Sequence, residues 1–128
     1  MAGIGKRFID AGYNIPKYLI KVKNKTLFEW SLNSLPLELA DKLIFILLEE
    51  HEKEYKVSKY IDSIFANHIN IEYLFLKAQT KGQAETVYKA KDKINLSNKL
   101  IIFNIDTNFH SSTLKVNLQK QCDGLVGV

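Results

Sequence analysis

The sequence has a single cysteine, Cys122, among its 128 residues. One thiol excludes an internal disulfide and a zinc site made of several thiolates, and it is typical of a reducing compartment. No apolar run approaches the roughly 20 residues that cross a bilayer, and the first residues lack the apolar core of a signal peptide. We therefore expect a cytoplasmic protein with no membrane partner.

Residues that interrupt regular structure are also scarce, since there are only two prolines and six glycines. The sequence contains no linker, internal repeat or low-complexity segment, so we expect one domain. The chain is 46% hydrophobic and 25% charged, which supplies a core and argues against disorder. Its net charge of +4 comes from lysines spread beside glutamates. We interpret this excess as a preference for small anionic ligands, and we predict no nucleic-acid partner.

Short apolar runs predict strands that are covered on both faces, because the runs are continuous and do not alternate with polar residues. These runs span residues 42–48, 71–76, 100–105 and 125–128. Amphipathic segments between them predict helices over residues 26–35, 52–65 and 82–94. Pro36 is expected to end the first of these helices near Ser34.

Strands that alternate with helices of this length indicate βαβ units. We therefore predict an α/β fold with three layers, in which a mostly parallel sheet is flanked by helices. Ligands bind at the edge of such a sheet where the carboxyl ends of its strands meet. Three polar loops follow these strands, or stand where a strand is expected before them, so we expect all three loops at that edge.

The first loop lies at the start of the chain and reads MAGIGKRF. Gly3 and Gly5 leave backbone N–H groups open to phosphate oxygens. Arg7 offers a bidentate fork for an anion, and Lys17 adds a compact charge after the rigid Pro16. The spacing matches neither a dinucleotide fingerprint nor a P-loop. The alternative is a surface turn with solvated cations.

The second loop spans residues 78–86 and reads AQTKGQAET. Gln79, Thr80 and Gln83 have the donors and acceptors that hydrogen-bond a nucleobase. Gly82 permits close packing against such a base. The alternative is that Thr80 or Gly82 only caps the helix that follows.

The third loop begins where an apolar run ends in Asp106. A carboxylate at this edge of the sheet can bridge Mg²⁺ to phosphate. One carboxylate is sufficient, because magnesium keeps several waters and takes further ligands from the phosphates. The alternative is that Asp106 caps a turn.

Together these stretches resemble the sugar-phosphate nucleotidyltransferase family, whose members have a GT-A-like Rossmann fold. The family's opening is similar to MAGIGKRF, PKYLIKV and KTLFEWSLNSL, its base-binding loop and helix to TKGQAETVYKA, and its metal-binding strand end to LIIFNIDT. The motifs keep their order over nearly the whole chain. The resemblance implies an enzyme that transfers a nucleoside monophosphate from a nucleoside triphosphate to a sugar phosphate or similar small phosphorylated acceptor. Pyrophosphate is released, and the product serves surface polysaccharide synthesis.

The resemblance also implies a role for each matching residue. Arg7 is expected to hold the outer phosphates, and Lys17 is expected to stabilise the charge that builds on the α-phosphate. The expected cofactor is Mg²⁺, bound by Asp106. The expected nucleotide-binding residues are Ala2, Gly3, Gly5, Gln79, Thr80, Gly82 and Gln83.

Compared with that family, residues 1–128 are expected to form one partial nucleotide-binding domain that lacks the first strand and the acceptor-binding half. One alternative is a non-catalytic interaction module or an inactive fragment. Because an incomplete sheet exposes edges that pair with other chains, a homo-oligomer is left open. Another alternative is a GT-A glycosyltransferase with a nucleotide-sugar donor. Two neighbouring acidic residues would favour it, whereas Thr107 and Asn108 follow Asp106 here.

Overall fold

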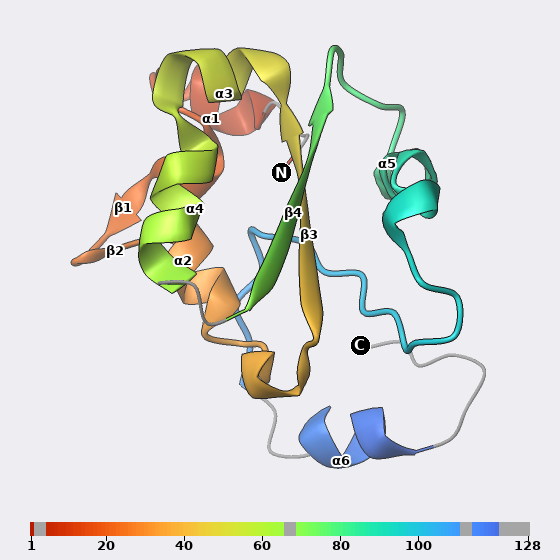
Figure 1. Ribbon diagram of the computed structural model, residues 1–128. Helices are drawn as coiled ribbons and strands as arrows, with labels where there is room; N and C mark the ends of the chain where they lie inside the picture. The colour runs from red at the N-terminus through yellow and green to blue at the C-terminus, as the bar shows by residue number, and fades with distance from the viewer. Residues whose placement is uncertain (2–4, 66–68, 111–113, 121–128) are drawn as a thin grey trace.

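The computed structural model describes residues 1, 5–65, 69–110 and 114–120, and its main feature is a parallel sheet between layers of helices (Figure 1). Helices α2, α3 and α4 lie on one side of this sheet, and α5 lies on the other. The predicted α/β class with flanking helices is therefore confirmed. The helices are α1 (Lys6–Asp10), α2 (Leu27–Leu32), α3 (Glu49–Tyr55), α4 (Val57–Phe65), α5 (Gln83–Lys89) and α6 (Leu114–Gln119), with 3₁₀ turns η1 (Lys17–Leu19), η2 (Leu37–Leu39) and η3 (Lys91–Lys93). The strands are β1 (Lys21–Val22), β2 (Lys25–Thr26), β3 (Lys42–Leu48) and β4 (Asn70–Leu76).

The central sheet consists of β3 and β4. The two strands run parallel, with Lys42 opposite Asn70 and Leu48 opposite Leu76. The α3–α4 pair connects them, as a parallel pair requires a crossover. Both strands are confirmed close to their predicted bounds. The short β1 and β2 form a separate antiparallel hairpin.

Side chains of β3 alternate between two hydrophobic clusters, because successive residues of a strand point to opposite faces. The main cluster lies toward α2 and α4, and its buried members are Tyr18, Phe28, Leu32, Phe45, Leu47, Val57 and Ile61. The smaller cluster, on the opposite face, contains Leu48 and Leu76. Since Tyr18 belongs to the main core, the preceding residue, Lys17, is fixed relative to the sheet.

Helix α2 begins where the sequence predicts. Thr26 is its N-cap, since its Oγ1 accepts from the Glu29 N–H at 3.1 Å and its own N–H donates to the Glu29 carboxylate at 2.7 Å. This reciprocal pair is a capping box, which satisfies two otherwise free backbone donors. The helix ends at Leu32, just ahead of Pro36.

The single helix predicted over residues 52–65 is wrong, because the segment forms two helices, α3 and α4. Lys56 lies between them with φ 52° and ψ 47°, a left-handed conformation that ends α3. Its N–H donates to the Glu52 carbonyl at 3.0 Å. The Glu52 carboxylate then accepts from the Ser58 N–H at 2.8 Å and from the Ser58 hydroxyl at 2.7 Å. The chain can turn here because these bonds satisfy groups at the junction of the two helices.

The strand predicted over residues 100–105 is also wrong, because these residues form no strand. Leu100, Ile101 and Ile102 are 51%, 49% and 51% exposed. A strand needs a hydrogen-bonded neighbour, and within the described part of the chain β3 pairs only with β4. The apolar run is typical of a buried strand, but it does not show whether a neighbouring strand is present to pair with it. The run at 125–128 lies outside the described residues.

The helix predicted over residues 82–94 is shorter than expected. It is observed as α5, which ends at Lys89, followed by the turn η3. None of the described helices combines the length and the apolar character needed to span a membrane.

Candidate functional site

The structure brings Lys17 and Asp106 together, although 89 positions separate them in the chain. The Lys17 ammonium donates to the Asp106 carboxylate and forms an ion pair. Their side chains are 23% and 38% exposed, so both remain open to a ligand. Each charge of this pair can also bind an outside group. The ammonium group can bind a phosphate, and the carboxylate can bind a metal ion.

The backbone around Lys17 is fixed by its neighbours. Pro16 precedes the turn η1 and accepts a hydrogen bond from the Leu19 N–H at 2.8 Å. Tyr18 is fully buried, and Ile20 is 6% exposed. Lys17 is therefore the polar member of a turn whose other side chains are held in the core.

Gly5 contacts the stem of Lys17. It has φ 67°, which is in the left-handed region, and it caps the start of α1. A Cβ on Gly5 would lie 3.2 Å from the Lys17 Cβ and 3.3 Å from its Cδ. Glycine is required here both for the backbone conformation and for the close approach.

Replacing Gly5 with Ala is expected to destabilise the fold by roughly 1–2 kcal/mol, because of the left-handed backbone, and also to displace Lys17. The matched control is Gly12→Ala, since Gly12 has φ 87° but a methyl group there would meet no atom within 4 Å. Urea unfolding should show a comparable loss for both variants. The nucleotidyl transfer that the resemblance implies should fall only with Gly5→Ala, and an equal fall in both would contradict a specific contact with Lys17.

The loop that carries Asp106 is held by the end of α2. The Ser31 hydroxyl donates to the Thr107 carbonyl at 2.6 Å, and the Asn104 carbonyl lies 3.3 Å away. The Ser34 hydroxyl accepts from the Phe109 N–H at 2.9 Å. These serines, one in α2 and one in the turn that follows it, were missed by sequence reasoning. Two hydroxyls on an otherwise apolar stretch are the signal that could have identified them.

The loop of residues 79–83 starts α5. Gly82 is the N-cap of α5, which is the position that the capping alternative gives it, and no side chain caps the helix. Thr80 hydrogen-bonds to the Thr86 hydroxyl. Gln83 reaches across to the third loop, and its Nε2 donates to Asn104 Oδ1 at 2.9 Å. The second and third loops are thus joined side chain to side chain.

Several of these groups line one groove with a volume of about 920 Å³, whereas Gly5, Ser31 and Ser34 do not. Its walls include the edge of β3 over residues 42–46 and the irregular segment 99–106. The predicted site residues that line it are Lys17, Gln79, Thr80, Gly82, Gln83 and Asp106. Arg7 is exposed on α1 and does not line the groove. Ala2 and Gly3 lie outside the described residues.

The Met1 amino group lies within the influence of both charges. Burial, followed by the positive charge of Lys17, lowers its pKa to about 6, while Asp106 acts in the opposite direction.

One carboxylate is available as a metal ligand. Within the described residues, no group of three or more His, Cys, Asp or Glu side chains is placed to hold a metal ion. Asp106 alone fits an Mg²⁺ ion that takes its other ligands from phosphates and water. It does not fit a metal held by the protein alone.

Comparisons with known proteins identify the family of this chain. The sequence profile of the family described as nucleotidyl transferase matches residues 1–122. Among solved structures, the chain is similar to the nucleoside-diphosphate-sugar pyrophosphorylase from Vibrio cholerae RC9, with 32% identity and a TM-score of 0.57 over 74% of this chain. Among curated proteins, it is similar to translation initiation factor eIF2B subunit gamma of Dictyostelium discoideum, with 29% identity over 97 residues, or 73% of this chain. The chain spans 41% of that solved chain and 21% of the curated relative.

Proposed function

This chain belongs to the nucleotidyl transferase family, and on that basis we propose that its groove binds a nucleoside triphosphate for transfer of the nucleoside monophosphate. The acceptor is a sugar phosphate or a similar small phosphorylated molecule, and the product serves surface polysaccharide synthesis. An acceptor phosphate oxygen attacks the α-phosphorus in line. The new P–O bond forms as the bond to the β-phosphate breaks, and pyrophosphate leaves with that electron pair. The name of the solved relative, a nucleoside-diphosphate-sugar pyrophosphorylase, supports this acceptor class.

The observation that carries the proposal is the contact between Lys17 and Asp106 on the groove. Phosphoryl transfer depends mainly on positioning and on stabilising charge, and it needs little from a protein nucleophile. Lys17 is placed to stabilise the charge that develops on the α-phosphate. Gly5 packs against its stem, and Gln79 and Gln83 line the groove with amide groups for the base.

Asp106 is the residue that would hold Mg²⁺. When bound, Mg²⁺ supplies positive charge that neutralises the phosphates. The ion pair would have to open for this, so that Lys17 would contact a phosphate and Asp106 would hold the metal ion. Each charge keeps an opposite charge beside it, which limits the cost of opening.

The groove also supports the expectation of an incomplete sheet. Its walls include the edge of β3 that β4 leaves open and the irregular segment 99–106, with apolar side chains from both layers of helices, such as Leu32 and Val87. A strand covered on both faces is mainly apolar. We propose that a further apolar strand beside β3 completes this nucleotide-binding domain and pairs with residues 100–105, and that the acceptor site is formed elsewhere in the whole protein.

A second candidate is a non-catalytic interaction module. The open edge of β3 favours it, because unpaired edges pair with other chains. The curated relative is named as a subunit of a translation initiation factor. Such a module would form oligomers or bind partners without responding to nucleotides.

A thermal-shift titration separates these functions. Each of the four ribonucleoside triphosphates and dTTP is added with Mg²⁺ to the 128-residue chain, and to a version with an apolar strand joined ahead of Met1. We expect a rise in Tm of roughly 5–10 °C with the preferred nucleotide at saturating concentration. A larger rise in the extended version would support the strand proposal. No shift in either version, together with a stable oligomer, would contradict nucleotide binding and favour the interaction module.

A further inference from the structure

The segment that carries Lys17 is held at both ends by helix α3. At one end, the Tyr55 hydroxyl donates to the Asn14 carbonyl at 2.9 Å. At the other end, the Tyr18 hydroxyl lies 3.0 Å from His51 Nδ1. His51 and Tyr55 are four positions apart on α3, so they share one face of the helix. Lys17 thus lies inside a stretch of five residues, 14–18, whose two ends are fixed by one helix.

The contact between His51 and Tyr18 is buried. His51 is 8% exposed, and Tyr18 is fully buried. The His51 ring packs against both tyrosines, with ring centroids 5.8 Å from Tyr18 and 6.4 Å from Tyr55. His51 therefore links helix α3 to the turn η1 through a buried hydrogen bond.

We propose that His51 is a positioning residue for Lys17, and that its neutral form keeps Lys17 in place through the hydrogen bond to Tyr18. The proposal rests on the proposed function, in which Lys17 acts on the α-phosphate. His51 does not touch the groove itself. Its influence passes through Tyr18 to the adjacent residue.

The surroundings of His51 favour its neutral form. Burial lowers the pKa of His51, while Glu50 and Glu54 of the same helix and the Met1 amino group change it by smaller amounts. Burial raises the pKa of Tyr18, so its hydroxyl keeps its proton. A neutral imidazole with its proton on Nε2 can therefore accept from the Tyr18 hydroxyl at Nδ1, and Nε2 lies 3.9 Å from the Glu50 carboxylate.

Protonation would reverse this hydrogen bond. A charged imidazole has a proton on Nδ1, so it can only donate to the Tyr18 oxygen, and it places a charge in a buried site. The folded state binds the His51 proton less readily than the unfolded state, whose pKa is about 6.5. The contribution of neutral His51 to stability is therefore complete above that pH and is lost as the pH falls below it. The position of Lys17 is expected to loosen over the same acidic range.

Kinetics of the whole protein test this inference with three variants. His51→Phe removes the acceptor, Tyr18→Phe removes the donor, and His51→Gln restores an acceptor that does not titrate. We expect kcat to fall about tenfold in the two Phe variants, as misplacement of a catalytic group does, with KM for the nucleotide changed less than about threefold. His51→Gln should recover most of kcat. Its kcat should also fall less below about pH 6.5 than that of the original protein, because glutamine does not titrate. Equal pH profiles for the original protein and His51→Gln would overturn the inference.

A second measurement does not depend on turnover. Acylation of lysines followed by mass spectrometry reports how exposed Lys17 is, with the exposed Lys59 as the internal reference. We expect Lys17 to react several-fold faster in His51→Phe than in the original protein, at a temperature where both are folded, and Lys59 to be unchanged. Faster labelling without any nucleotidyl transfer would refute the proposed function and keep the positioning role. Unchanged labelling in a folded His51→Phe variant would refute the positioning role.

Discussion

Replacing Lys17 with Met is expected to lower nucleotidyl transfer about 10²–10³-fold, the range seen when one preorganised stabilising group is removed. Met keeps an apolar stem against Gly5 but removes the ammonium group that pairs with Asp106. The fold should remain, because this ion pair is partly exposed and contributes about 1 kcal/mol or less. Steady-state release of pyrophosphate and urea unfolding measure the two effects separately.

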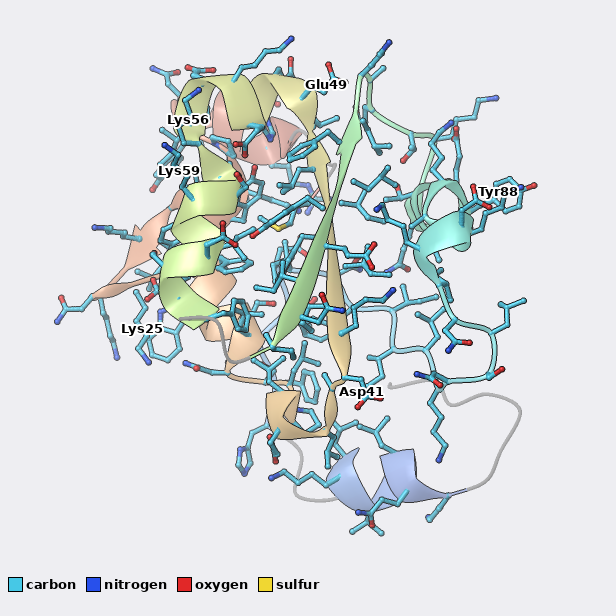
Figure 2. All side chains as sticks on the ribbon, in the orientation of Figure 1. Lys25, Asp41, Glu49, Lys56, Lys59 and Tyr88 are labelled. Atoms are coloured by element: carbon cyan, nitrogen blue, oxygen red, sulfur yellow. The ribbon has the colours of Figure 1, made fainter. Side chains whose placement is uncertain are left out.

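The matched control for this prediction is Lys59→Met. Lys59 lies on α4 and points away from the sheet, as do the labelled Lys25 and Lys56 (Figure 2). Its replacement makes the same change in net charge far from the groove. We expect transfer within about twofold of the original rate, which is typical of a surface change away from the site. An equal loss in both variants would mean that net charge, and not the place of Lys17, determines the rate.

Replacing Asp106 with Asn is expected to lower transfer by at least about 10²-fold and to weaken its dependence on Mg²⁺. The amide has nearly the shape of the carboxylate, so the loop held by Ser31 and Ser34 should keep its structure. A neutral oxygen is a poorer ligand for a hard cation than a carboxylate. The Mg²⁺ concentration that gives half the maximal rate should therefore rise several-fold, and a titration of the rate with Mg²⁺ measures it.

Asp41→Asn provides the control for this metal prediction. Asp41 lines the same groove but lies at the start of β3, at the opposite end of the sheet from the labelled Glu49 (Figure 2). Its replacement should leave the Mg²⁺ titration unchanged. If Asp41→Asn has the same effect as Asp106→Asn, the groove attracts Mg²⁺ through diffuse charge, and Asp106 is not a ligand.

The strands and the cap of α2 were predictable because their signals are local. Residues 42–48 are apolar without alternation, which fits a strand covered on both faces, and they form β3 as predicted. Thr26 and Glu29 carry the capping box within one turn of helix. The break at Lys56 was not predictable in the same way, because a lysine gives no signal for a left-handed backbone.

The sequence predicted that the three loops would be neighbours, because each loop follows a strand or stands where one is expected. The structure brings Lys17 into contact with Asp106, although residues 100–105 form no strand. The serines that hold the third loop, Ser31 of α2 and Ser34 just after it, and the histidine of α3 that contacts the turn η1 come from elements with no motif. Their roles depend on which helix packs against which loop.

The sequence by itself determined the α/β class, the two paired strands and the set of polar loops, because periodicity and capping are properties of neighbouring residues. Only the tertiary structure decided that residues 100–105 form no strand, since pairing depends on whether another segment occupies the space beside β3. It also decided the partners of Lys17, which are Gly5 and Asp106. Contacts across such separations depend on how the layers pack, and no local pattern encodes that packing.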